Sequence, residues 1–457
     1  MGVNGGADKT ELFERTAVPK AVMTMVVPTI LSSLVMVLYN LADTWFVGML
    51  NDPIQNSAVT LAAPVLLAFN AVNNLFGVGS SSLMSRSLGK KDYDSVQRSS
   101  ALGFYCALVC SMLFSVGYTL LRQPLLVTLG TDSETVRATS EYLRWTVTCG
   151  AAPAILNVVM AYLVRAEGAA LHASIGTMSG CLLNIVLDPI FILPWGLNMG
   201  ASGAGLATFL SNCAACAYFF VLLYCRRGKT LVSISPSMLK ADWTVFKEIC
   251  GVGVPAAIQN LLNVTGMTVL NNFTSSFSPS VVAAMGIAQK INMIPLYIAL
   301  GFSQGVMPLI SYSYAGEHNR RMRDTILFSV KLALGFMVAV SLEYFLGSEQ
   351  LIFLFMKNET IVQYGGSFLR GLCLALPFLC LDFLAVGVFQ ACGMGRKALV
   401  FAVLRKIVLE IPALFLLNRL WPIYGLAYAQ LSAELVLSIA AVITVTRLLQ
   451  KTAAAGP

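Results

Sequence analysis

The chain has 457 residues, of which 57% are hydrophobic and only 11% are charged, whereas an ordinary soluble domain carries about 25% charged residues. This composition excludes a soluble enzyme. It also argues against a nucleic-acid-binding protein, because little soluble surface remains on which the formal charge of +8 could form a basic patch. Long apolar runs recur along the whole chain, so we expect an all-α membrane protein without a cofactor.

Twelve segments are long and apolar enough to cross the bilayer as helices. They span residues 17–48, 55–84, 97–121, 134–164, 169–192, 200–225, 244–275, 281–313, 323–346, 362–391, 397–419 and 424–447. The longest connection, 226–243, separates an N-terminal lobe of six helices (17–225) from a C-terminal lobe of six (244–447). Segments 1–16 and 448–457 flank the two lobes.

Basic residues set the expected orientation. The loops after even-numbered segments are rich in Lys and Arg, as in Lys90 to Arg98, Arg226 to Lys240 and Arg320 to Arg323. The positive-inside rule therefore places these loops, the 226–243 linker and both termini in the cytoplasm.

The two halves resemble each other in sequence. Pro28 aligns with Pro255 and Gly89 with Gly316, both at an offset of 227, and "NIVLDP" from Asn184 aligns with "KIVLEIP" from Lys406. Six helices per half give both halves the same orientation, which predicts a parallel repeat about an axis along the membrane normal. The chain has no phosphate-binding loop, so transport would draw on an ion gradient.

Among the acidic residues of the predicted membrane segments, five qualify as functional candidates, because a charge near the bilayer centre costs about 3 kcal/mol on insertion scales and so suggests a function. They are Asp43, Asp188, Asp382, Glu410 and Glu434. Asp43 and Asp188 fall at similar depth near the outer ends of their segments. Tyr39 and Asn184 each precede one of them by four residues and share its helix face. Such a site could hold a proton or coordinate Na⁺, and the sequence leaves both open.

Four segments resemble the multidrug and toxic compound extrusion (MATE) family: "PTILSSLVMVLYNLADTWFVG" from Pro28, "GVGSSSLMSRSLGKKD" from Gly77, "NIVLDPIF" from Asn184 and "GASGAGLAT" from Gly200. The chain looks most like the bacterial branch with acidic residues in the N-terminal lobe. The resemblance implies a V of two pseudo-symmetric lobes in the bacterial inner membrane. Such a protein exports cationic or amphipathic compounds in exchange for H⁺ or Na⁺, and we expect a monomer.

The same resemblance implies a first-lobe ion site. It comprises Asp43, Asp188, Asn184, Asn157, Thr208 and Tyr39. Asn157 and Thr208 are the weaker members, because Asn and Thr also hold membrane helices together. Pro28 removes one helical hydrogen bond about fifteen residues before Asp43, so we hypothesise a hinge that ion binding biases between straight and bent shapes.

The second lobe departs from the related NorM-like branch. That branch has a Glu where this chain has Asn263, while Asp382 lies within one residue of an acidic position. Lys290 is a candidate to neutralise Asp382. Lys406 stands one turn before Glu410, where the first lobe has Asn184, and we expect an ion pair between them.

Substrate recognition by such an exporter would need a large apolar cavity with few polar groups, and aromatic faces attract organic cations. The candidates for its lining are Met36, Met160, Met267, Met293, Tyr297, Phe302 and Phe378, although most Met in a helix bundle only fills space.

Two alternatives differ in mechanism. A flippase for lipid-linked precursors would share the architecture, but we would expect several cations in its cavity to bind a pyrophosphate. A membrane-embedded prenyl transferase would need paired Asp-rich motifs for Mg²⁺, and the chain has none.

Overall fold

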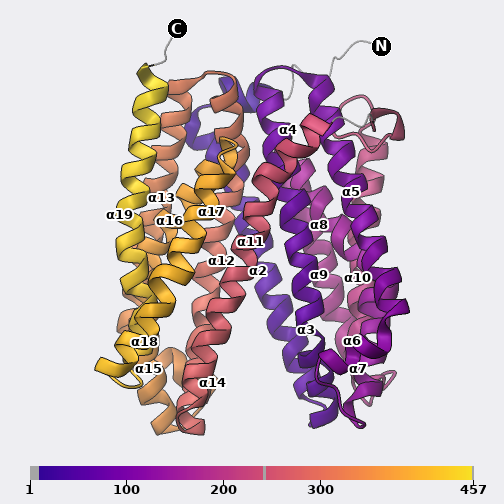
Figure 1. Ribbon diagram of the computed structural model, residues 1–457, viewed down its shortest axis with the longest axis vertical. Coiled ribbons are helices and arrows are strands. Elements are labelled where there is room, and N and C mark those ends of the chain that lie inside the picture. Colours follow the sequence, from indigo (N-terminus) through magenta and orange to yellow (C-terminus); the bar gives the residue numbers. More distant parts are fainter. Residues whose placement is uncertain (1–9, 240–242, 455–457) are drawn as a thin grey trace.

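The computed structural model describes residues 10–239 and 243–454, which form two helical bundles side by side (Figure 1). The bundles meet at the end of the molecule where both termini lie and diverge toward the other end, which gives the V shape that the family resemblance implied. Each bundle is made from one half of the sequence.

The N-terminal half follows a short helical turn, η1 (Glu11–Arg15). Its helices are α2 (Val18–Gly48), α3 (Pro53–Asn73) continuing through η2 (Asn74–Val78) into α4 (Gly79–Gly89), α5 (Tyr93–Leu120), α6 (Arg122–Thr128), α7 (Thr135–Leu143) continuing through η3 (Arg144–Cys149) to α8 (Ala151–Ala166), α9 (Ala170–Ile192) and α10 (Gly200–Cys225).

The C-terminal half repeats this order after a connection that includes η4 (Pro236–Met238). Its helices are α11 (Trp243–Ser275), α12 (Pro279–Ala315), α13 (Asn319–Leu346), α14 (Ser348–Phe355), α15 (Glu359–Cys373), α16 (Leu376–Ala391), α17 (Gly395–Val403) continuing through η5 (Leu404–Glu410) to α18 (Ile411–Leu420), and α19 (Gly425–Ala454).

Each of the twelve predicted segments corresponds to one helix or to consecutive helices. Two of them bend sharply: α7 and α8 meet at 51°, and α15 and α16 at 42°. Pro153 and Pro377 stand at these bends, since proline is tolerated in the first turn of a helix but interrupts a helix interior. The short α6 and α14 were not predicted. They occupy equivalent places in the two halves.

Two spans would be missed by hydropathy alone. Among the described residues, eight helices are long and apolar enough to cross a membrane, or ten if each bent pair is one span. The other two predicted segments are α11 and the continuous run from α17 to α18. The first carries several amide side chains, and the second carries Arg405, Lys406 and Glu410. These polar residues lower the hydropathy of both spans, and Arg405, Lys406, Glu410 and, from α11, Asn263 meet inside the second lobe.

The most extensive contact between the two halves is that of α2 with α12. The contact uses glycine: a Cβ at Gly305 would lie 2.8 Å from Val26 Cα, and one at Gly301 would lie 3.0 Å from Ile30 Cα. Ser82 Oγ on α4 donates to the Gln390 carbonyl at 2.6 Å, and Arg86 lies 3.5 Å from Glu248. Between described residues, the hydrogen bonds and ion pairs that join the halves all lie near the end that carries the termini.

Residues Glu11–Thr16, here termed the N-terminal strap, lie across this closed end. Phe13 is fully buried and stacks on Tyr312 of α12 with ring centroids 4.7 Å apart. Tyr312 donates its hydroxyl to Glu14 at 2.6 Å, and Arg321 donates to the carbonyls of Leu12 and Thr16 at 3.1 and 2.6 Å. Part of the expected cytoplasmic segment 1–16 is therefore packed structure that ties the chain start to the second half.

The predicted linker and tail also contain ordered structure. Glu167 accepts hydrogen bonds from the Thr230 hydroxyl and the Leu231 amide, and Tyr105 donates to the Ile234 carbonyl, so residues 230–234 are docked on the N-terminal half. Lys240, one of the expected inner-side cations, lies outside the described residues. At the other end, α19 continues to Ala454, so most of the expected tail 448–457 extends the last helix.

Candidate functional site: two buried acidic clusters

Asp43 on α2 and Asp188 on α9 form the first cluster, termed here the first-lobe pair. The helices α2 and α9 pack against each other, and the two carboxylates are close enough to act on each other electrostatically. Asp188 is fully buried. Asp43 is partly buried, and its Oδ1 is enclosed without a hydrogen-bond partner. The structure thus brings together two acids that are 145 residues apart in the sequence, and their role as an ion-coupling pair stays a prediction.

Asn184 is held beside Asp188 by helical spacing. In the orientation that satisfies both ends of its amide, Asn184 donates to the two Asp188 oxygens at 2.8 and 3.2 Å, and its oxygen accepts from the Thr208 amide at 3.0 Å. In the opposite orientation it would reach only the Thr208 hydroxyl, at 3.3 Å. We prefer the first orientation, because the second would point the amide oxygen at a carboxylate.

Two tyrosines complete the surroundings of the first-lobe pair. Tyr39, one turn before Asp43, interacts with Asp43, Asp188 and Thr208. Tyr142 on α7 is nearly fully buried and lies within electrostatic range of both carboxylates. Tyr142 was not predicted, because nothing in its local sequence pattern separates it from a tyrosine at the membrane interface.

Asn157 forms its hydrogen bonds with residues outside the first-lobe pair and its surrounding side chains. Its amide donates to the Pro153 carbonyl at 2.7 Å and to Asn212 Oδ1 at 3.0 Å, so it links α8 to α10 one turn away from Thr208. No hydrogen bond joins it to either carboxylate of the first-lobe pair among the described residues. Its expected place in the ion site stays a prediction.

The first-lobe pair has no positive partner. Within the described ranges, neither Asp43 nor Asp188 forms an ion pair, and no set of three or more His, Cys, Asp or Glu side chains is arranged to hold a metal ion. Two close carboxylates with amide, hydroxyl and phenol groups around them offer oxygen ligands for Na⁺ or a place for a proton. The chemistry that this arrangement supports is reversible cation or proton binding.

The second cluster lies in the C-terminal half. It is termed the second-lobe cluster and comprises Asp382 on α16, Arg405, Lys406 and Glu410 on η5, and Glu434 on α19. Arg405 Nη1 lies 3.2 Å from Asp382 Oδ2, its Nη2 donates to Asn263 Oδ1, and its Nε is 4.0 Å from Glu434 Oε1. Lys406 Nζ contacts both Glu410 oxygens at 2.6 and 2.7 Å, as the i,i+4 spacing predicted.

The expected partner of Asp382 was wrong. Arg405, not Lys290, neutralises this carboxylate, because η5 turns both Arg405 and Lys406 into the bundle interior while Lys290 is exposed on α12. Arg405 was not among the predicted site residues. An arginine in the middle of a predicted span was the signal that could have found it, since intramembrane charges face the bundle interior.

Two of the expected cavity residues were also wrong for this conformation. Met160 is completely buried and Phe302 is 4% exposed, and both belong to the packed core. Met267 is 46% exposed, and Met36, Met293, Tyr297 and Phe378 are partly buried, so these five remain available to line a space between the halves.

Pro28 lies inside the unbroken helix α2. Thr29 next to it donates its hydroxyl to the Met25 carbonyl at 2.7 Å, so a local side-chain bond reinforces the helix where proline removes a backbone one. The role of Pro28 as a hinge stays a hypothesis.

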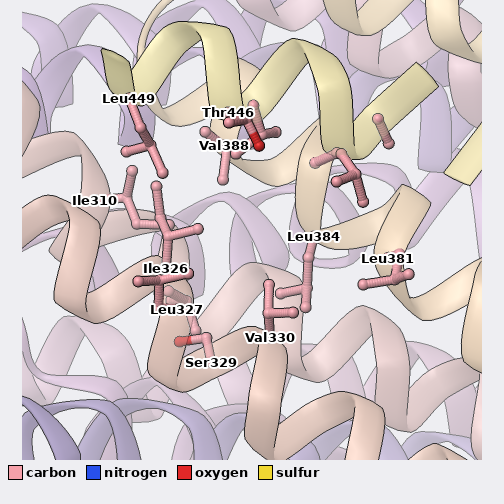
Figure 2. Close-up of a pocket in the computed structure, with 15 residues that line it drawn as sticks. Ile310, Ile326, Leu327, Ser329, Val330, Leu381, Leu384, Val388, Thr446 and Leu449 are labelled. Carbon is pink, nitrogen blue, oxygen red and sulfur yellow. The ribbon is translucent and has the colours of Figure 1, made fainter. Parts of the chain in front are cut away.

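A separate apolar cavity of about 130 Å³ lies between α12, α13, α16 and α19 (Figure 2). Its lining includes Ile310, Ile326, Leu384 and Leu449, with Ser329 among them, and it contains no residue of either acidic cluster. It has no charged group with which to hold an ion.

Known proteins resemble this chain over nearly its whole length. The MatE family model matches residues 28–190 and 255–416, so it matches the chain twice, beginning at the two prolines of the internal repeat. The multidrug export protein MepA of Staphylococcus aureus is 32% identical over 437 residues, which cover 95% of this chain and 94% of MepA. Two solved structures cover 99% of each chain at 25% identity. One is described as the outward-facing conformation of a multidrug resistance MATE family transporter (TM-score 0.92), and the other as MATE in the straight conformation (TM-score 0.91).

Proposed function

Because this chain belongs to the MATE family of membrane transporters, we propose that it is a secondary antiporter that exports cationic or amphipathic organic compounds in exchange for H⁺ or Na⁺. The coupling site is the first-lobe pair. The observation that carries this proposal is the pair of neighbouring carboxylates, the partly buried Asp43 and the fully buried Asp188, without an ion-pair partner among the described residues.

Ion binding would act on helix position through simple electrostatics. Two ionised carboxylates at close range in a medium of low dielectric constant repel each other, and one proton or one Na⁺ removes that repulsion. Asp43 is on α2, which packs against α9 in its own half and against α12 in the other half. A change in the spacing of Asp43 and Asp188 is therefore transmitted to the contact between the halves, and Pro28 supplies the point where α2 yields.

The direction of transport follows from the orientation. The basic loops favour cytoplasmic termini in the cytoplasmic membrane of a bacterium, so the closed end faces the cytoplasm and the diverging end faces outward. In this outward-facing state, substrate leaves and an external cation reaches the first-lobe pair. Binding of that cation then favours the return to the inward-facing state.

The flippase alternative gains no support from the site. Recognition of a pyrophosphate needs cations free to meet it, whereas Arg405 and Lys406 are each paired with a carboxylate and the first-lobe pair contains none. We therefore retain cation export as the function.

Uptake of a fluorescent organic cation into everted vesicles tests the proposal, with pH and Na⁺ gradients imposed separately. Asp43→Asn removes a titrating carboxylate at nearly constant volume, so gradient-driven uptake should fall to the level of vesicles without the protein. Asp324→Asn, which alters an exposed acid at the start of α13, serves as the matched control and should transport normally.

Membrane abundance and monodispersity of both variants must match the parent protein. Undiminished uptake by correctly folded Asp43→Asn protein would refute the assignment. The gradient that drives uptake by the parent protein identifies the coupling ion.

A further inference from the structure

The second-lobe cluster contains more buried negative charge than positive charge. Its three carboxylates are Asp382, Glu410 and Glu434, which are 1%, 6% and 0% exposed, and its two cations are Arg405 and Lys406, which are 2% and 8% exposed. The charged groups that act on Glu434 are these same four neighbours, and the facing residue on α11, Asn263, is neutral. With every group ionised, the cluster would carry a net charge of −1.

A net charge in this position is strongly unfavourable, because the cluster lies in mid-helix positions of the spanning segments and is closed off from water. The imbalance is removed if one carboxyl carries a proton. The hydrogen bonds identify which one it is. Asp382 accepts from Arg405, and Glu410 accepts twice from Lys406, so both are held as anions. Both oxygens of Glu434 are buried without a hydrogen-bond partner.

We propose that the second-lobe cluster is a proton-binding site, that Glu434 is the residue that carries the proton, and that Arg405 is its movable counterion. This inference rests on charge and contacts within the C-terminal half, and it holds whether or not the first-lobe pair couples transport. It assigns the second lobe one bound proton and no free metal cation, since Arg405 already supplies the positive charge beside Asp382.

Arg405 is placed to respond when Glu434 loses its proton. Its Nη1 contacts Asp382. Its Nε has no hydrogen-bond acceptor among the described residues and lies 4.0 Å from Glu434 Oε1. A small displacement of the guanidinium would turn this approach into a charge-assisted hydrogen bond. The reaction is Glu434–COOH giving Glu434–COO⁻ and H⁺, and it leaves a net charge of −1, so release requires water or a cation to reach the cluster.

Infrared spectroscopy of the full-length protein in lipid tests the charge count, because a protonated carboxyl has a C=O stretching band that a carboxylate lacks. The first-lobe pair is silenced by Asp43→Asn and Asp188→Asn, so that any remaining band at neutral pH comes from elsewhere. We expect one band in this background, shifted in D₂O when it exchanges. Glu434→Gln should remove it, and the control Glu343→Gln, at an exposed position on α13, should keep it.

Two further variants distinguish a charge-balanced cluster from a single perturbed side chain. Asp382→Asn brings the ionised cluster to neutrality, so the band should also vanish although Glu434 is intact. Arg405→Gln removes one positive charge, so the band intensity should rise about twofold.

The proposal is overturned if the silenced background shows no band, if the band survives Glu434→Gln, or if it persists in Asp382→Asn. Each variant is scored only if it elutes as a monodisperse species. Because Glu434→Gln and Asp382→Asn are both near-isosteric and neutral, either one that folds is enough to decide the question.

Discussion

In the fifth membrane span of each half, a carboxylate occupies the same repeat position, but the charges of the side chains around it differ between the two halves. In α9, Asn184 donates to Asp188, and the nearest charged group is a second carboxylate, Asp43. In η5, Lys406 stands where Asn184 stands and neutralises Glu410, while Arg405 beside it neutralises Asp382. The same fold thus holds a site that lacks a cation and a site that contains two. In our proposal, the amide of Asn184 leaves room for the coupling ion, whereas the ammonium of Lys406 fills the equivalent place with a tethered cation.

The largest effect should come from making the first lobe resemble the second. Asn184→Lys puts an ammonium one turn before Asp188 and should form the i,i+4 pair seen at Lys406 and Glu410. The carboxylate would then be permanently neutralised, and gradient-driven transport should fall to background in folded protein. Asn184→Gln is the control that keeps an amide. Transport by the lysine variant at parental rates would show that this position does not define the difference between the lobes.

Removing the tethered cation of the second lobe should damage stability rather than transport. Lys406→Gln leaves Glu410 buried and unpaired, which costs about 3 kcal/mol or more. Thermal unfolding in detergent should show a clear decrease in Tm. The double variant Lys406→Gln/Glu410→Gln should recover most of the loss, because no charge is left uncompensated. A single variant as stable as the parent would contradict the idea of a structural pair.

A smaller effect is expected at the closed end, where the two halves are joined. Phe13 of the N-terminal strap is buried against Tyr312, and Phe13→Ala removes this stacking contact, which is worth about 1 kcal/mol beyond the buried area. The conformational balance should therefore shift toward opening at this closed end. Labelling of a cysteine placed at Ser82, in a background without other cysteines, measures that opening. Leu31→Ala, on the exposed face of α2, is the control.

The smallest effect concerns pH at the strap. The hydrogen bond from the Tyr312 hydroxyl holds the pKa of Glu14 below its usual value against the opposing effect of partial burial, and Lys91 and His318 lower this pKa further. Ionised Glu14 therefore supports closure above its ordinary pKa of about 4.5, and this support is lost as the pH falls through the lowered value. Glu14→Gln should weaken closure at neutral pH by less than about 1 kcal/mol, because the group is near the surface. An unchanged acid dependence of Ser82 labelling in that variant would assign the effect to another group.

Much of the fold could be predicted from local patterns. Apolar length indicated most of the spans, and the repeated prolines indicated the two halves, because both features belong to the chain itself. The breaks at Gly150 and near Pro377 were not predicted. A proline near the start of a helix and a proline inside one look alike in sequence, and packing decides whether the chain bends there.

The contacts in the candidate sites also divide into those that the sequence could predict and those that it could not. Helical spacing was sufficient to pair Asn184 with Asp188 and Lys406 with Glu410, since residues four apart lie on one face. It could not choose Arg405 over Lys290 as the partner of Asp382, nor bring Tyr142 to the first-lobe pair. Those contacts join different helices and depend on how each helix is rotated about its own axis.

By itself, the sequence determined that this is a membrane protein, that its two halves are an internal repeat, and that the acidic residues of both clusters lie within the spans. These properties follow from composition and periodicity, which act along a single helix. Only the tertiary structure decided which charges meet, which methionines are buried, and at which end the halves close. Such outcomes depend on contacts between residues far apart in the chain, where close packing admits one arrangement among many that the local pattern allows.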